Sequence, residues 1–273
     1  MSALLSLAHL TVLKAHPLEL IDLAAGTGFD AVGLRIWAPT SADTIEPVID
    51  RPDLQAAIRR RLRDTGVRLY DVEAFWLLPD SDLARMRQAY EVGAELGARH
   101  VVLAGNDPDP ARLIDNFGRT CADARACGLV PMLEFIPYTT VRSLADAQAL
   151  RLGAGADGAG ILVDALHLAR SGGAPADLGA YPPELFRYLH LCDAPAAAPA
   201  DTAGLRREAR SARLYPGEGD LWLTDLIGAL PADTPIAVEA PTALHAGLSL
   251  AEQASLAATT ARSVIEQARQ RKV

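Results

Sequence analysis

Cysteine is scarce in this sequence: the 273 residues include only three, Cys121, Cys127 and Cys192. Their number is odd, and no two of them form a C-x-x-C pair. A disulfide framework and a C-x-x-C redox or metal motif are therefore not expected. Reduced cysteines are typical of the cytoplasm, which we expect as the compartment of this protein.

Long apolar runs are also missing, since no stretch reaches the roughly 18 residues that suggest a membrane span. The apolar segment Leu4–Leu13 has no basic residue before its core and contains His9. We therefore predict that it begins with a strand and is not a signal peptide. No membrane partner is expected.

Positive charge is in deficit, because 26 Lys and Arg residues stand against 34 Asp and Glu residues, for a net charge of −8. The one dense basic cluster, Arg59–Arg63, lies in a helical pattern and is typical of a solvated face. Such a chain is a poor nucleic-acid binder without a local basic groove. We expect a small-molecule substrate and no nucleic-acid partner.

Glycine-rich nucleotide motifs are absent as well. The sequence has no Walker A motif, and Gly26-Thr27-Gly28 follows a helical pattern, so it predicts a helix end and not a dinucleotide-binding turn. The alternative of a doubly wound open sheet is correspondingly weaker, because that fold usually uses five or six strands and an early glycine turn.

The dominant pattern is an alternation of short β-rich runs with longer amphipathic runs. The predicted strands are Leu4–Leu10, Ala31–Ile36, Val67–Glu73, Arg99–Ala104, Val130–Phe135, Ala159–Asp164, Arg187–Cys192 and Ile236–Glu239. The predicted helices are Pro17–Gly26, Asp53–Thr65, Ser81–Leu96, Pro110–Ala126, Ser143–Leu152, Pro183–Phe186, Leu221–Leu230 and Ser249–Arg269. The segment Ala194–Ala203 is predicted to be a loop. This alternation indicates an α/β fold, a (β/α)8 TIM barrel formed as one domain over residues 1–273. Apolar outer helix faces fit a homo-oligomer as well as packing within one chain.

Four predicted strands end in potential metal ligands: Glu134, Asp164, His190 and Glu239. The C-terminal strand ends of a barrel meet at one mouth, where catalytic groups belong. A single carboxylate at a strand end is usually solvated or salt-bridged. Several converging carboxylates repel one another, and a bound divalent cation removes that penalty. Oxygen-rich ligands suit Mn²⁺, Mg²⁺ or Co²⁺ better than structural zinc.

Other polar residues near the predicted mouth are candidate substrate contacts. Arg35 and Glu73 end the second and third predicted strands, and either could instead be an ordinary surface group. Arg210 and Arg213 are three residues apart, so one helical turn would let both reach an anionic group, whereas a solvated basic loop is the alternative. Asp193 could orient His190 or another residue of the site.

The motifs L-E-F at 133–135, V-D-A-L-H at 163–167, H-L-C-D at 190–193, P-G-E-G at 216–219 and V-E-A-P at 238–241 together resemble those of the xylose isomerase-like TIM barrels. That superfamily includes ketose 3-epimerases, inosose dehydratases, 3-dehydroshikimate dehydratases and, more distantly, endonuclease IV. The resemblance covers essentially the whole chain and is weak for substrate.

The resemblance implies specific roles. It makes Glu134, Asp164, His190 and Glu239 the ligands of one divalent cation, most simply Mn²⁺, and His167 a substrate-contacting catalytic group. Glu134 and Glu239 would also act as acid and base. The chain lacks the epimerases' arginine shortly after the strand-seven histidine, for which Arg210 or Arg213 could substitute, and it has too few histidines for the three-metal endonuclease pattern.

The expected activity is isomerisation or epimerisation of a sugar or sugar-like keto compound through an enediolate, in carbohydrate metabolism. The alternative is a lyase, a dehydratase of the 3-dehydroshikimate or inosose type, because the same site can expel a β-hydroxyl group.

Overall fold

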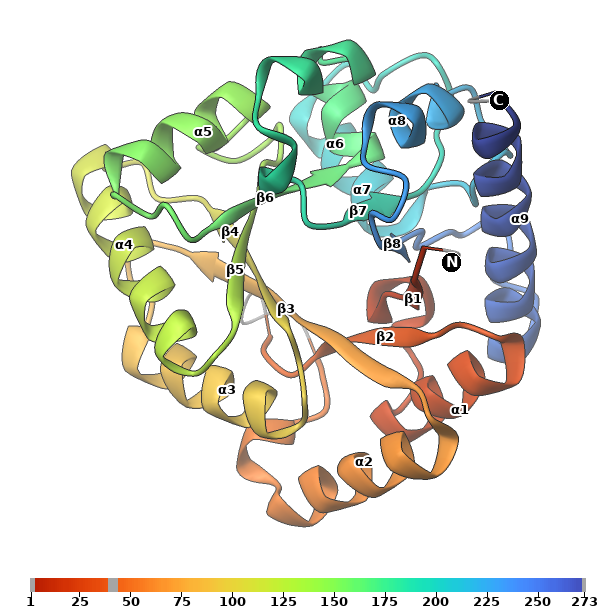
Figure 1. Cartoon of the computed structure of the whole chain (residues 1–273), viewed down its shortest axis with the longest axis horizontal. Coiled ribbons are helices and arrows are strands. Elements are labelled where there is room, and N and C mark those ends of the chain that lie inside the picture. The colour runs from red at the N-terminus through yellow and green to blue at the C-terminus, as the bar shows by residue number, and fades with distance from the viewer. Residues whose placement is uncertain (1–2, 39–43, 272–273) are drawn as a thin grey trace.

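Eight parallel strands close into a barrel in the order in which they occur along the chain, β1 to β8 (Figure 1). The computed structural model describes residues 3–38 and 44–271. The strands are β1 Leu5–Leu7, β2 Ala31–Arg35, β3 Arg68–Leu77, β4 His100–Gly105, β5 Val130–Glu134, β6 Gly160–Asp164, β7 Leu189–Leu191 and β8 Ile236–Val238. The helices are α1 Pro17–Thr27, α2 Pro52–Thr65, α3 Leu83–Glu95, α4 Pro110–Ala126, α5 Leu144–Gly153, α6 Ala165–Arg170, α7 Thr202–Ser211, α8 Leu223–Ala229 and α9 Leu250–Gln270.

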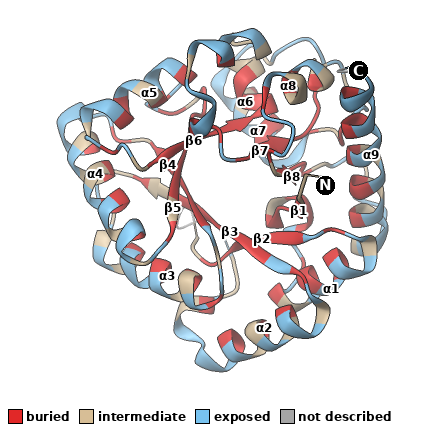
Figure 2. Cartoon of the chain, viewed as in Figure 1, coloured by how far each residue is buried: buried red, intermediate tan, exposed pale blue. Residues whose placement is uncertain are grey.

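The predicted (β/α)8 barrel is confirmed, and the open-sheet alternative is wrong because β1 pairs with both β2 and β8. The helices form an outer ring with buried inner and exposed outer faces (Figure 2). In α9, for example, Ala254, Ala257, Ala258 and Ala261 are buried at helical spacing, so packing within the chain accounts for this alanine stripe. Across residues 3–38 and 44–271, no helix combines the length and apolarity needed to cross a bilayer.

Several local predictions were wrong. The third strand, predicted to end at Glu73, continues to Leu77. The first strand ends at Leu7, not at Leu10, because the chain curls into a 3₁₀ turn, His9–Val12, that is stabilised by a 2.9 Å contact from His9 Nε2 to the Ala15 carbonyl. The segment predicted as a helix at Pro183–Phe186 contains only a 3₁₀ turn, Pro183–Leu185.

The segments that follow β6 and β7 also differ from the prediction. An α-helix, α6, follows β6 directly because the Asp164 carboxylate caps its N-terminus. The predicted loop Ala194–Ala203 runs into α7, whose N-terminus Asp201 caps. This additional helix matters for function, because it leads to Arg213 at the barrel mouth.

Side chains fill the barrel in a separate inner cluster. Its members are Ala31, Tyr70, Val102, Met132, Leu162, Tyr188 and Ala237. Tyr70 is an extra residue in β3, since Val32 pairs with Leu69 and Gly33 with Asp71. This bulge brings both Tyr70 and the next residue, Asp71, toward the interior.

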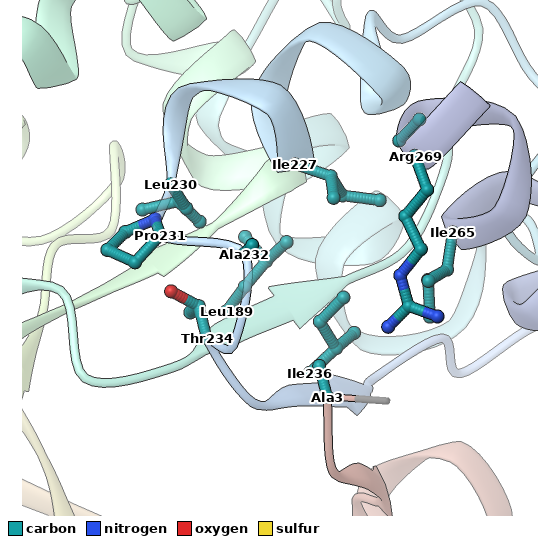
Figure 3. A pocket seen from close by; sticks show the side chains of 11 residues that line it. Ala3, Leu189, Ile227, Leu230, Pro231, Ala232, Thr234, Ile236, Ile265 and Arg269 are labelled. Atoms are coloured by element: carbon teal, nitrogen blue, oxygen red, sulfur yellow. The ribbon is translucent and has the colours of Figure 1, made fainter. Parts of the chain in front are cut away.

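A small apolar cavity of about 40 Å³ lies at the N-terminal end of the barrel strands, opposite the mouth (Figure 3). It lies between α8, α9 and the first residues of β7 and β8, Leu189 and Ile236. Catalytic groups of such barrels gather at the C-terminal ends of the strands, so this cavity is on the face associated with stability.

Candidate metal centre and active site

Four buried side chains meet at the C-terminal mouth of the barrel. Glu134 and Asp164 are the last residues of β5 and β6, His190 lies in β7, and Glu239 directly follows β8. One ligand atom from each residue lies within 4.8 Å of the others. The sheet register explains this convergence, since Asp164 pairs with His190, and His190 with Ala237. The four residues singled out from the sequence therefore come together.

The imidazole of His190 lies between two carboxylates. Its Nδ1 atom is 3.5 Å from both Glu134 Oε1 and Glu239 Oε2. These distances exceed those of ordinary hydrogen bonds. Within the described part of the chain, both ring nitrogens of His190 and the Glu134 Oε1 atom are buried without a hydrogen-bond partner. Buried polar atoms are rarely left so, and one divalent cation would satisfy Glu134 Oε1 and one of the two ring nitrogens. The donor set, three carboxylates and one imidazole, fits such an ion.

The charges at this cluster are strongly coupled. Burial alone would lower the pKa of His190, but the carboxylates of Glu239 and Glu134 raise it well above its usual value. Burial alone would raise the pKa of Glu239, but the positive charges of His190, Arg213 and Arg35 lower it below its usual range. The cluster therefore attracts positive charge, as a cation site must.

Arg213 supplies a second positive charge directly at the cluster. Its Nη1 atom lies 2.5 Å from Asp164 Oδ2, and its Nη2 atom lies 3.1 Å from Glu239 Oε2. The guanidinium also donates to the carbonyls of Ala209 and Glu239 and to Cys192 Sγ. Arg213 is only 2% exposed. It therefore holds two of the four candidate ligands in place.

The P-G-E-G turn that follows Arg213 is organised by Asp193. The Asp193 carboxylate accepts backbone N–H groups from Gly217, Gly219 and Leu221 at 2.9–3.0 Å. A Cβ atom on Gly219 would lie 2.5 Å from the Ala194 carbonyl oxygen, so the turn requires glycine there. Asp193 does not contact His190 in any hydrogen bond of the described residues; it supports the turn next to Arg213 instead.

His167 lies one helical turn beyond Asp164. Its backbone N–H donates to Asp164 Oδ1 at 2.9 Å, and this bond keeps His167 close to the barrel mouth. The residue is 3% exposed. The ring packs edge-on against Tyr138 with centroids 6.0 Å apart, and Arg206 of α7 lies 5.7 Å above the same Tyr138 ring. Sequence reasoning missed Tyr138, which has no strand-end signal.

The other residues predicted to contact substrate lie in two separate places. Arg35 and Glu73 are buried neighbours on β2 and β3, with Arg35 Nε 3.8 Å from Glu73 Oε1. Arg210 is exposed and lines a surface cavity with Lys14 and Thr242. The two arginines predicted to act together therefore point to different places, because α7 ends at Ser211, between them.

Asp71 is a buried carboxylate that the sequence reasoning also missed. Neither of its oxygens has a hydrogen-bond partner among the described residues, and it packs against the backbone of Gly33, where a Cβ would lie 2.6 Å away. Burial, with the charges of Glu239 and Glu134, raises the pKa of Asp71 to about 7. Burial, with the charges of Glu239 and Asp71, raises the pKa of Glu73 to about 8. Asp71 and Glu73 are two residues apart in β3, so their side chains point to the same face of the strand. This spacing was the signal in the sequence that could have found Asp71.

Comparison with known proteins identifies the family. Residues 21–262 match the model of the xylose isomerase-like TIM barrel, and the chain belongs to this family, as the motifs predicted. A sequence comparison with curated proteins finds no match. The chain spans 44% of the length of a xylose isomerase-like TIM barrel/4-hydroxyphenylpyruvate dioxygenase fusion protein, with a TM-score of 0.80 at 18% identity over 99% of this chain.

Three other solved structures share the fold at low sequence identity. The IolI protein with a bound zinc atom has a TM-score of 0.78 at 18% identity, over 96% of this chain and 98% of that one. The probable 3-DHS dehydratase AsbF from Bacillus anthracis has a TM-score of 0.72 at 13% identity, over 96% and 99%. D-allulose 3-epimerase from Methylomonas sp., in complex with D-allulose, has a TM-score of 0.70 at 16% identity, over 97% of both chains. At these sequence identities, the likeness shows a shared fold alone.

Proposed function

We propose that the protein is a divalent-metal-dependent isomerase or epimerase of a sugar or sugar-like keto compound. The observation that carries this proposal is the buried cluster of Glu134, Asp164, His190 and Glu239 at the barrel mouth, with His190 and Glu134 atoms that lack partners. Membership of a family whose structural neighbours include a sugar epimerase supports the substrate class. Mn²⁺ is our preferred ion for this oxygen-rich set.

The four clustered residues would hold the cation. When bound, it would polarise a substrate carbonyl and acidify the adjacent C–H group. Glu134 ends β5 and Glu239 directly follows β8, and these two carboxylates are the groups proposed to remove and return the proton. His167 would orient the substrate oxygens from the α6 side of the mouth, and Arg213 would hold Asp164 and Glu239 in place.

The fate of the proton decides the outcome of the reaction. Its return to the neighbouring carbon gives an isomer, and its return from the opposite face gives an epimer. Loss of a β-hydroxyl group gives a dehydration product, so a lyase of the dehydroshikimate or inosose type is the second candidate. One structural neighbour, a probable 3-DHS dehydratase, favours this alternative. The guanidinium of Arg213 does not, because it is buried and already donates to Asp164, Glu239 and Cys192.

Metal content provides the first test. Elemental analysis after dialysis and Mn²⁺ reloading should find about one ion per chain in the wild-type protein and much less in Glu239→Gln. Glu266→Gln, an exposed glutamate of α9, is the matched control and should retain the ion. Absence of retained metal in a folded wild-type protein would contradict the proposal.

A substrate panel then separates the two activities. Neutral ketoses and 3-dehydroshikimate are incubated with the Mn²⁺-loaded protein in deuterated water. Deuterium incorporation into a ketose without new double-bond absorbance supports the isomerase or epimerase. Absorbance growth with 3-dehydroshikimate alone would make the enzyme a lyase.

A further inference from the structure

Two buried side chains at the mouth lie next to each other without forming a hydrogen bond. Arg35, the last residue of β2, and Glu73 of β3 are paired in the sheet register and are 8% and 1% exposed. Arg35 Nε lies 3.8 Å from Glu73 Oε1, beyond hydrogen-bond distance. Within residues 3–38 and 44–271, neither atom has a hydrogen-bond partner. A donor and an acceptor are thus both buried and both unused.

The spacing of these two atoms suits one hydroxyl group. An oxygen can lie about 2.8 Å from both Nε and Oε1, accepting a hydrogen bond from the first and donating one to the second. While Glu73 is ionised, a carbonyl oxygen would satisfy only Arg35, and a carboxylate would meet the charged oxygens of Glu73. A neutral Glu73, which its pKa of about 8 favours, could also donate to an oxygen; a hydroxyl group pairs with Arg35 and with either form of Glu73.

The pair lies at the same C-terminal mouth of the barrel as the metal centre, because Arg35 ends β2 as Glu134 and Asp164 end β5 and β6. The charge of Arg35 lowers the pKa of Glu239, and the charges of Glu239 and His190 act on Glu73. Strands β2 and β3 lie across the barrel from β6 and β7 (Figure 1). A ligand bound at the four-residue cluster would therefore extend toward Arg35 and Glu73 with its far end.

We propose that Arg35 and Glu73 form a subsite for one hydroxyl group of a neutral, polyhydroxylated substrate, remote from the carbons that react. This inference rests on the proposed function and narrows its substrate class to ketoses or inososes with hydroxyl groups beyond the reacting pair. The pair acts as a specificity determinant, because a substrate without that hydroxyl leaves both buried atoms unpaired.

Equilibrium binding to the Mn²⁺-loaded protein tests the subsite. D-fructose, D-allulose, D-tagatose and D-sorbose are titrated first, and the tightest ligand is then compared with its 4-, 5- and 6-deoxy forms. We expect one deoxy form to bind ~10- to 100-fold more weakly to the wild-type protein. The same deficit should be smaller in Arg35→Met and in Glu73→Leu, because each variant leaves only one partner for the hydroxyl.

Matched controls separate this effect from general damage. Arg87→Met and Glu91→Leu change an exposed pair of the same residue types on α3 and should keep the wild-type discrimination. Glu73→Gln retains an acceptor oxygen and should keep most of it. Thermal unfolding and manganese content confirm that each variant is folded and loaded, and Arg35→Met carries the comparison alone if Glu73→Leu does not fold.

The outcomes also separate this inference from the proposed function. Hydroxyl discrimination without any proton exchange would refute the proposed activity and support the subsite. Turnover with equal binding of all deoxy forms, or discrimination that is undiminished in Arg35→Met, would overturn the subsite alone. Binding of none of the four ketoses by a metal-loaded protein would also overturn it.

Discussion

Replacing Arg213 with methionine should destabilise the protein strongly, because two buried carboxylates would lose their counter-charge. The guanidinium lies 2.5 Å from Asp164 and 3.1 Å from Glu239, and all three side chains are buried. Removing one partner of a buried ion pair typically costs about 3–5 kcal/mol. At roughly 2–4 °C per kcal/mol for a chain of this size class, the unfolding midpoint should fall by roughly 6–20 °C.

The same variant should respond more strongly to metal. A cation at the cluster would supply positive charge to Asp164 and Glu239, and the removal of Arg213 would relieve its repulsion of that cation. We therefore expect Mn²⁺ to raise the unfolding midpoint more in Arg213→Met than in the wild-type protein. Metal at 100 times its dissociation constant stabilises any folded protein that binds it by about 2.7 kcal/mol.

Circular dichroism melts in EDTA and in excess Mn²⁺ would measure both effects. Arg87→Met is the control, since its ion pair with Glu91 is exposed to solvent and should contribute little to stability. A midpoint for Arg213→Met within about 2 °C of the wild-type value in EDTA would refute this reasoning. An equal or smaller response to Mn²⁺ would show that the guanidinium and the cation do not share the carboxylates.

Three further predictions follow from the same region. Burial raises the pKa of Glu73 to about 8 from its usual 4.5. The contribution of Glu73 to stability is therefore present below about pH 4.5 and is lost as the pH rises through 8. In melts with EDTA, the unfolding midpoint should decline toward alkaline pH, and this decline should be smaller in Glu73→Gln. Gly219→Ala should destabilise the protein by about 1–3 kcal/mol and reduce turnover, because its Cβ would strike the Ala194 carbonyl, whereas Gly26→Ala, in open space on α1, should stabilise it by about 0.5–1 kcal/mol in the same denaturant titration. Asp193→Asn should cost about 1–3 kcal/mol in such a titration by turning donors toward the N–H groups of the turn; unchanged stability would show that another group can hold the turn.

Much of the fold and part of the site follow from local pattern. Pro110–Ala126, for example, is predicted and observed with the same bounds, because its apolar positions recur at helical spacing after an Asp109 cap. Glu134 and Asp164 end their strands as predicted, and the parallel pairing of the strands is enough to bring such residues to one mouth.

The errors arise where contacts between distant segments overrule local signals. His9 leaves the first strand, and its ring accepts the backbone N–H of Arg35, 26 residues away along the chain. Arg210 and Arg213 share a basic segment, yet Arg213 is drawn inside by Asp164, 49 residues away along the chain. No periodicity carries that information.

The sequence by itself determined the barrel and the four polar residues at or next to the ends of its strands, since strand and helix periodicity and side-chain parity are properties of neighbouring residues. Only the tertiary structure decided which charges meet. It paired Arg213 with Asp164 and Glu239, placed Asp193 under the glycine turn, and set Arg35 and Glu73 3.8 Å apart. These pairings depend on the closure of the barrel and on the bulge in β3, which bring together side chains from segments far apart in the chain.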